Sequence, residues 1–108
     1  MILIVEDIDW IRSSMKRSVE REGYSAALAT DEAEAFEVAA RESIELILTE
    51  EKVPAFEALL ARLCEHPSLS RVPVVIVNPD AEEGARYGEA YLLTSYADIT
   101  SLLASLRG

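Results

Sequence analysis

The feature that most constrains the fold is an alternation of short apolar runs with longer segments in which apolar residues recur at helical spacing. Each run is long enough for one strand, and the segments between most successive runs are long enough for a helix. A sheet layered with helices is the architecture that produces this order. The expected strands are residues 2–5, 24–29, 44–49, 72–77 and 91–93.

The segments between these runs have the apolar spacing of amphipathic helices. Asp31 and Glu34 stand at the spacing of a capping box and predict the start of the second helix, while Gly23 is placed to end the first. The residues expected on the buried faces of the four helices are, in chain order, Ile11, Met15 and Val19; Ala33, Phe36 and Ala40; Phe56, Leu59, Leu60 and Leu63; and Ile99, Leu102, Leu103 and Leu106.

The element order predicts a single α/β domain over residues 1–108, built on a doubly wound parallel sheet. Right-handed crossovers make this sheet the natural assembly of alternating strands and helices. One connection is unusual, because residues 78–89 are few for a crossover and include Gly84 and Gly88. We therefore expect a further helix there, shortened or irregular, between the third and the last of the helices named above.

Composition excludes several classes of function. The 108 residues carry a formal net charge of −10, which repels phosphate backbones and anionic lipids and argues against direct binding to nucleic acid or membranes. Cys64 and His66 are the only cysteine and histidine, so we expect neither an internal disulfide nor a zinc site. We expect a cytoplasmic location. The four scattered glycines form no phosphate-binding loop, and no enzymatic motif is present.

Acidic residues follow two of the expected strands. Glu6 and Asp7 come directly after the first strand, and Glu50 and Glu51 come after the third. Ligands of doubly wound sheets bind outside the carboxyl ends of the strands, so these carboxylates are expected to converge there. Such a group is either a weak Mg²⁺ site or a solvated acidic rim. Without a cation, its like charges favour a protonated carboxyl or the approach of a basic side chain such as Arg12 or Lys52.

Three segments carry a family resemblance. The opening 2–7, the segment 45–54 with an acid at Glu50 and a proline four residues later, and the run 72–77 resemble the receiver domains of two-component response regulators. The resemblance covers nearly the whole chain. It implies a flavodoxin-like (βα)₅ fold with strand order 2-1-3-4-5. It also implies that acids after the first strand hold Mg²⁺ while a carboxylate after the third accepts a phosphoryl group from a histidine kinase.

Compared position by position, the chain keeps one part of that site and departs from the rest. Glu6 and Asp7 match the metal-binding pair of the family. Glu50 stands where the phosphoacceptor aspartate is expected, Asn78 stands in place of a serine or threonine, and Thr94 stands in place of a lysine. An acceptor oxygen displaced by roughly 1 Å can alone cost about 100-fold in rate, and loss of the lysine removes a charge that stabilises the transferring oxygens.

The resemblance and these departures together predict a degenerate receiver, or pseudo-receiver. It would act as a phosphorylation-independent module for protein interaction, without enzymatic activity and without a required cofactor. Two alternatives remain open, a phosphotransfer-competent receiver and a sensor of divalent cations or small ligands. Glu50 as a permanent mimic of the phosphorylated state is less favoured, because the groups that would respond to it are replaced at Asn78 and Thr94.

The expected partner is another protein or an effector domain on the carboxyl side of this one, and the domain can also pair with itself. Tyr91 matches the family's aromatic switch position. Tyr87, Tyr91 and Tyr96 are candidate interface anchors, with core packing as the alternative for each. Trp10 is expected to be half-buried beside the acidic residues.

Overall fold

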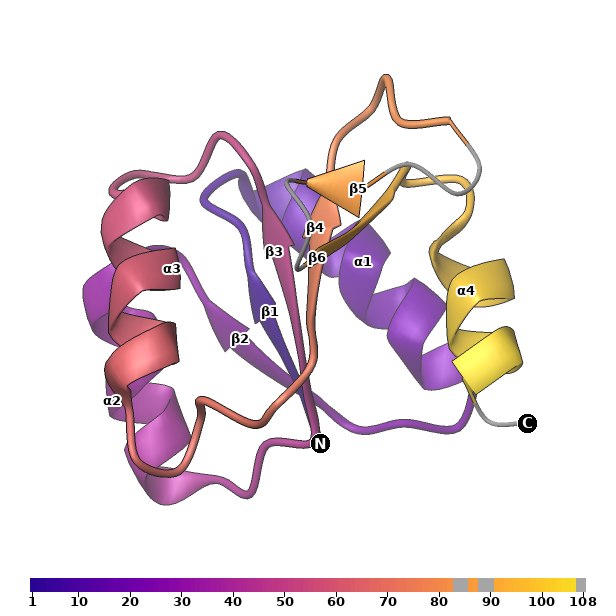
Figure 1. The fold of residues 1–108 in the computed structure, drawn as a ribbon. Helices are drawn as coiled ribbons and strands as arrows, with labels where there is room; N and C mark the ends of the chain where they lie inside the picture. The colour runs from indigo at the N-terminus through magenta and orange to yellow at the C-terminus, as the bar shows by residue number, and fades with distance from the viewer. Residues whose placement is uncertain (83–85, 88–90, 107–108) are drawn as a thin grey trace.

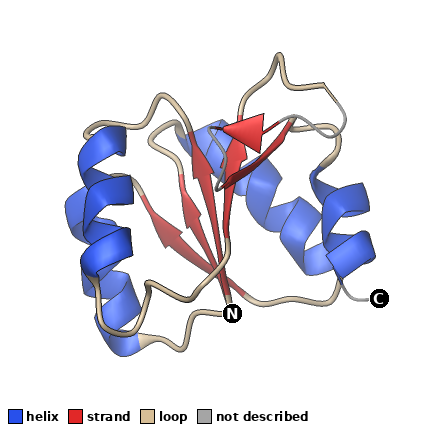
Figure 2. Cartoon of the chain, in the orientation of Figure 1, coloured by secondary structure: helices blue, strands red, loops and turns tan. Residues whose placement is uncertain are grey.

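The computed structural model describes residues 1–82, 86–87 and 91–106 as a three-layer α/β sandwich. A central sheet has helices on both faces (Figures 1 and 2). The strands are β1 (Ile2–Val5), β2 (Ala26–Ala29), β3 (Leu46–Glu50), β4 (Val74–Val77), β5 (Arg86–Tyr87) and β6 (Tyr91–Thr94), and the helices are α1 (Asp9–Arg21), α2 (Glu32–Arg41), α3 (Phe56–Glu65) and α4 (Ile99–Leu106).

The sheet has the order β2-β1-β3-β4-β6-β5, and its first five strands in this order are parallel. Strands β1, β3 and β4 are buried along their whole length, as expected for parallel strands that are covered on both faces. The register sets Val5 beside Thr49 and Glu50 beside Val77. The carboxyl ends of the central strands are therefore level, and the residues that follow them lie at one edge.

Two apolar clusters hold the layers together. Helices α2 and α3 cover one face of the sheet, and helices α1 and α4 cover the other (Figure 1). Leu3 and Ile47 belong to the cluster under α2 and α3, while their neighbours Ile4 and Leu48 belong to the cluster under α1 and α4. This alternation follows from the two-residue period of a strand.

The structure confirms the flavodoxin-like fold, and the five expected strands have the order 2-1-3-4-5. The expected fourth helix is not what the described part of residues 78–89 shows. Strand β5 instead pairs antiparallel with β6, with Tyr87 opposite Tyr91. Strand β5 lies in the connection between the parallel strands β4 and β6, and this connection is short for a helical crossover. Gly84 and Gly88 lie outside the described residues.

The helix faces agree with the sequence in α3 and differ in α2. All four apolar residues expected to be buried in α3 are buried. In α2, however, Ala33 and Ala40 are exposed, and Ala35 and Val38 face the core instead. An alanine-rich helix has little contrast between its faces, so the position of Val38 decides its rotation. Asp31 caps α2 as expected, because its Oδ1 accepts a hydrogen bond from Glu34 N at 2.9 Å.

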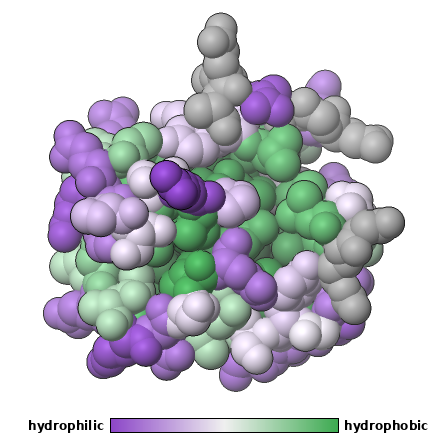
Figure 3. Space-filling model, turned by 60° about the horizontal axis from the view of Figure 1, so that its bottom comes forward, coloured by the Kyte–Doolittle hydropathy of each residue, from purple (hydrophilic) through white to green (hydrophobic). Residues whose placement is uncertain are grey.

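The amino ends of the strands form the opposite edge of the sheet. An apolar hollow of about 420 Å³ opens there, and Figure 3 shows apolar surface gathered on this face. Helix α4 spans only two turns and ends at Leu106, which is 48% exposed at the rim of the hollow. No helix of the described residues is long and apolar enough to cross a membrane.

Among the residues that the structure describes, two have left-handed backbone conformations, at very different energetic cost. Gly23 ends α1 with φ of 86°, which a glycine adopts freely. Ala55 precedes α3 with φ of 58° and ψ of 33°, where a Cβ atom costs roughly 1–2 kcal/mol. The turn between β3 and α3 therefore holds a strained residue close to Glu50.

We predict that Ala55→Gly raises the free energy of unfolding by about 1 kcal/mol, because glycine relieves the Cβ strain at this position. Urea denaturation measures the change. Ala58→Gly is the matched control, because Ala58 is exposed inside α3 and the same substitution there is expected to cost about 1 kcal/mol. Equal losses in both variants would show that Ala55 is not strained.

Candidate functional site

The carboxyl ends of the strands hold four of the predicted site residues. Glu6 follows β1, Glu50 ends β3, Asn78 follows β4 and Thr94 ends β6. Backbone hydrogen bonds continue the sheet to this edge, from Glu51 N to Val77 O at 3.1 Å and from Asn78 N to Thr94 O at 2.9 Å. We use the term acidic corner for Glu6, Asp7, Glu50 and Glu51.

Glu6 is the most buried acid of the corner, at 1% exposed. Its Oε1 accepts a hydrogen bond from the backbone N–H of Ile8 at 3.1 Å, and its Oε2 accepts one from the hydroxyl of Tyr96 at 3.4 Å. Burial raises the pKa of Glu6, the Ile8 N–H lowers it in part, and the negative charge of Glu50 raises it further. Both oxygens of this carboxylate thus already have donors within the chain.

Glu50 is also buried, at 5% exposed, and its carboxylate turns back toward its own loop. Its Oε2 accepts a hydrogen bond from the backbone N–H of Lys52. Burial raises the pKa of Glu50, and this effect outweighs the Lys52 N–H and the positive charge of Lys52, which both lower it. The side chain at the phosphoacceptor position is therefore held by the turn that follows it.

Asn78 and Thr94 are both committed to neighbouring groups. The Asn78 amide donates from Nδ2 to Oε2 of Glu51, and its Oδ1 accepts a hydrogen bond from Asp80 N at 2.8 Å. Thr94 is buried, and its hydroxyl donates to the carbonyl of Ser95 at 3.3 Å. Arg12 donates to the carbonyl of Glu6 at 2.9 Å and pairs with Asp9, so its guanidinium does not bond the Glu6 carboxylate.

The acidic corner meets some of the requirements of a divalent-cation site and lacks others. Carboxylate oxygens are the donors that Mg²⁺ takes, and Asp7 is exposed beside Glu6. Within the described part of the chain, however, no three Asp, Glu, His or Cys residues are placed to hold a metal ion together. The described residues of the corner are therefore not a preformed metal centre.

Tyr96 is the residue whose role the sequence did not indicate. It was predicted as an interface anchor, and the structure places its hydroxyl on the buried Glu6 carboxylate. Burial raises the pKa of Tyr96, and the negative charges of Glu6 and Glu50 add to this effect, so its hydroxyl stays a proton donor at neutral pH. The only signal in the sequence was the position of this tyrosine shortly after the last strand.

The other aromatic residues lie away from the acidic corner or point outward. Tyr91 contacts Cys64 Sγ through its hydroxyl at 3.2 Å, a contact that, with burial, raises the pKa of Tyr91 to about 12. Tyr87 packs edge-on against Phe56 with ring centroids 5.6 Å apart. The prediction for Trp10 was wrong, because its side chain is 74% exposed. Trp10 lies in the first turn of α1 and is not on the face of the helix that packs against the sheet, where Ile11 lies.

Comparisons with known proteins agree on the fold. No protein-family model and no curated protein sequence matches the chain. Similar solved structures include a sensor protein from Polaromonas sp. JS666, with a TM-score of 0.81 and 23% identity over 98% of this chain and 91% of that one. Chemotaxis response regulator CheY4 of Vibrio cholerae is similar with a TM-score of 0.79 and 16% identity over 97% and 96% of the two chains.

A third similar structure is the receiver domain of sensor histidine kinase PA1611 from Pseudomonas aeruginosa PAO1. Its TM-score is 0.75, with 21% identity over 96% of this chain and 93% of that one. That receiver holds a magnesium ion in its active-site cleft. Together these likenesses show that the chain has the CheY-like flavodoxin fold.

We predict that Glu50→Gln stabilises the fold at pH 7 by on the order of 1 kcal/mol, because glutamine accepts the Lys52 N–H bond without a buried charge. A carboxyl whose folded pKa is raised above the ordinary 4.5 favours folding below that pH, and this contribution is lost as the pH rises through the folded pKa. The advantage of the variant should therefore shrink as the pH falls toward 4. Thermal unfolding across this range measures it.

The control for this prediction is Glu37→Gln, which removes an exposed charge from α2 and should change stability little at any of these pH values. A Glu50→Gln variant that is less stable than the natural chain at pH 7 would mean that the charged form of Glu50 is the one the fold prefers.

We predict that Tyr96→Phe lowers the free energy of unfolding at neutral pH by about 1 kcal/mol, because the Glu6 carboxylate loses one of its two hydrogen-bond donors. A double-mutant cycle with Glu6→Gln isolates the pair and should give a nonzero coupling energy. The matched control is a cycle of Glu6→Gln with Tyr91→Phe, which removes a hydroxyl bonded to Cys64 instead. Equal coupling in both cycles would contradict a specific bond from Tyr96 to Glu6.

Proposed function

We propose that this chain is a receiver-like signalling domain that acts by binding a protein partner and is not phosphorylated at Glu50. The support is the fold it shares with receiver domains together with the state of the acidic corner. Each of the buried carboxylates Glu6 and Glu50 takes its hydrogen bonds from the chain itself. These bonds to the chain's own donors, at both oxygens of Glu6 and at Oε2 of Glu50, are the observation that carries the proposal.

The geometry of Glu50 argues against phosphotransfer. An attacking oxygen must be presented to the donor within a narrow range of positions, and displacement by about 1 Å can cost about 100-fold in rate. The Glu50 carboxylate is buried and bonded to Lys52 N, so it is directed toward the β3–α3 turn. A phosphoryl group would also meet a neutral Thr94 where charge stabilisation is needed.

The same arrangement argues against a permanently active form. Mimicry of a phosphorylated state by Glu50 requires groups that respond to its charge. At the matched positions, the Asn78 amide is bonded to Glu51 and the Thr94 hydroxyl is bonded to Ser95. We therefore favour a module whose output depends on its shape and surface, with no enzymatic activity and with a protein or an effector domain as its partner. The single Cys64 is consistent with a cytoplasmic setting.

A divalent cation is the second candidate ligand of the acidic corner. Glu6 and Asp7 are the residues that would hold it, and the charges of Asp7 and Glu50 both raise the pKa of Glu6, so a positive ion would be favoured electrostatically. When bound, such an ion neutralises the carboxylates and orients anionic oxygens near them. Its binding would be weak, because Glu6 is buried and one lone pair on each of its oxygens is already used by the Ile8 or the Tyr96 donor, while Asp7 is exposed to water.

The test is exposure of the chain to Mg²⁺ and beryllofluoride, a phosphoryl mimic, with backbone NMR of Glu50, Asn78 and Thr94 as the readout. We expect no bound species in slow exchange. The matched control restores the family residues as Glu50→Asp, Asn78→Ser and Thr94→Lys, and should bind the mimic if these three positions decide the function. If the triple variant does not fold, the single variant Glu50→Asp is used as the control.

A saturable beryllofluoride complex of the natural chain would overturn the proposal. So would a mass increase of about 80 Da after incubation with Mg²⁺ and a small phosphodonor, because this is the mass of one phosphoryl group. Mg²⁺ titration without beryllofluoride separates the second candidate, since a cation site shifts the amide signals of Glu6 and Asp7 saturably without any phosphoryl mimic.

A further inference from the structure

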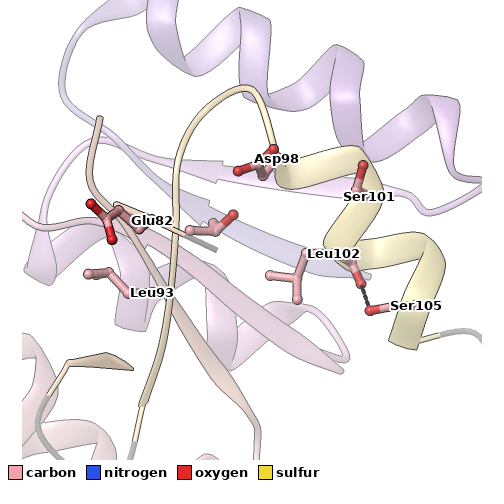
Figure 4. Close-up of a pocket in the computed structure, with 7 residues that line it drawn as sticks. Glu82, Leu93, Asp98, Ser101, Leu102 and Ser105 are labelled. Carbon is pink, nitrogen blue, oxygen red and sulfur yellow. Dashed lines mark hydrogen bonds between the residues drawn. The ribbon is translucent and has the colours of Figure 1, made fainter. Parts of the chain in front are cut away.

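A groove of about 360 Å³ lies between β6 and α4, beside the acidic corner but formed by other residues. Figure 4 shows Leu102 pointing from α4 toward β6, with Glu82 across the groove from Asp98. Seven described residues line it: Glu82, Leu93, Thr94, Asp98, Ser101, Leu102 and Ser105. Its volume is at the small end of the range for ligand pockets, which suits one side chain better than a cofactor.

The groove has a distinct chemical character. Glu82 and Asp98 supply two carboxylates, and none of the seven described lining residues carries a positive charge. Asp98 is exposed, and its Oδ2 accepts a hydrogen bond from Ser95 at 3.0 Å, which leaves its other oxygen for an incoming donor. Leu93 and Leu102 add apolar surface, and Ser101 adds a hydroxyl.

We propose that this groove receives the side chain of an arginine from a protein partner. The inference deepens the proposed function, because it names a chemical feature of the partner. A guanidinium has five N–H donors and no acceptor, so it suits carboxylate oxygens on two sides of a groove. Its aliphatic stem can lie against Leu93 and Leu102. The net charge of −10 attracts a basic partner over a longer range.

The groove and the acidic corner are adjacent through β6, because Thr94 lines the groove and ends the strand beside Asn78. Tyr96 then lies between Thr94 and Asp98 in the chain and bonds Glu6. An occupied groove therefore contacts the segment that holds Tyr96 on the acidic corner, without any covalent change at Glu50.

The test uses the 108-residue chain and Nα-acetyl-arginine amide as the probe, with amide NMR signals of Leu93, Thr94 and Leu102 as the readout. Nα-acetyl-citrulline amide is the matched neutral control of nearly the same shape. We expect saturable shifts with the arginine probe, weakening as salt is added, and at least about tenfold weaker binding of the citrulline probe.

Two variants locate the site. Glu82→Gln and Asp98→Asn together should weaken binding of the arginine probe at least about tenfold, whereas Glu37→Gln on α2 should leave it unchanged. The Asp98→Asn substitution keeps a side-chain oxygen that can accept the Ser95 hydrogen bond. If the double variant does not fold, Glu82→Gln alone is tested.

Equal binding of the arginine and citrulline probes, or binding that the two variants do not weaken, would overturn this inference. Tighter binding of spermidine at the same residues would also overturn it, because a free polyamine would then be the ligand. Failure of the arginine probe while beryllofluoride also fails to bind removes this inference and leaves the proposed function intact. If both beryllofluoride and the arginine probe bind, the proposed function is removed and the arginine site remains.

Discussion

The structure depends on how it accommodates carboxylates at the buried carboxyl edge of a parallel sheet. A buried carboxylate is costly unless donors reach it. This chain provides such donors from its own backbone and from one tyrosine, and these donors hold Glu6 and Glu50 in place. The two buried carboxylates of the acidic corner are consequently held by donors of the chain itself, and Asp7 and the surfaces around the corner are what other molecules can contact.

Much of the fold could be predicted because burial on both faces leaves a direct trace in sequence. The continuous apolar runs identified β1, β3 and β4, and the apolar spacing of α3 identified its buried face. The prediction was less successful where local contrast was low or long-range packing decided the outcome. Alanine-rich α2 was rotated from the expected face, and β5 replaced part of an expected helical crossover.

The location of the candidate site could also be predicted, because the ends of parallel strands meet at one edge whatever follows them. Its hydrogen bonds could not. The Tyr96 hydroxyl reaches Glu6 across ninety positions of sequence, and no local pattern records that contact. Trp10 was wrongly expected to be half-buried, since adjacency in sequence to Asp7 and Asp9 does not determine which way a side chain in the first helical turn points.

The most direct test of whether the chain's own donors hold these carboxylates is the carboxyl carbon titration of Glu6 and Glu50 by NMR, recorded with and without millimolar Mg²⁺. Burial outweighs these donors, so both midpoints are expected above the ordinary glutamate value of 4.5, and carboxylates held by the chain's own donors give the same midpoints in the two series. A marked downward shift of either midpoint on adding Mg²⁺ would show that a cation, and not Tyr96 or the Lys52 backbone, is the group that these carboxylates are arranged to bind.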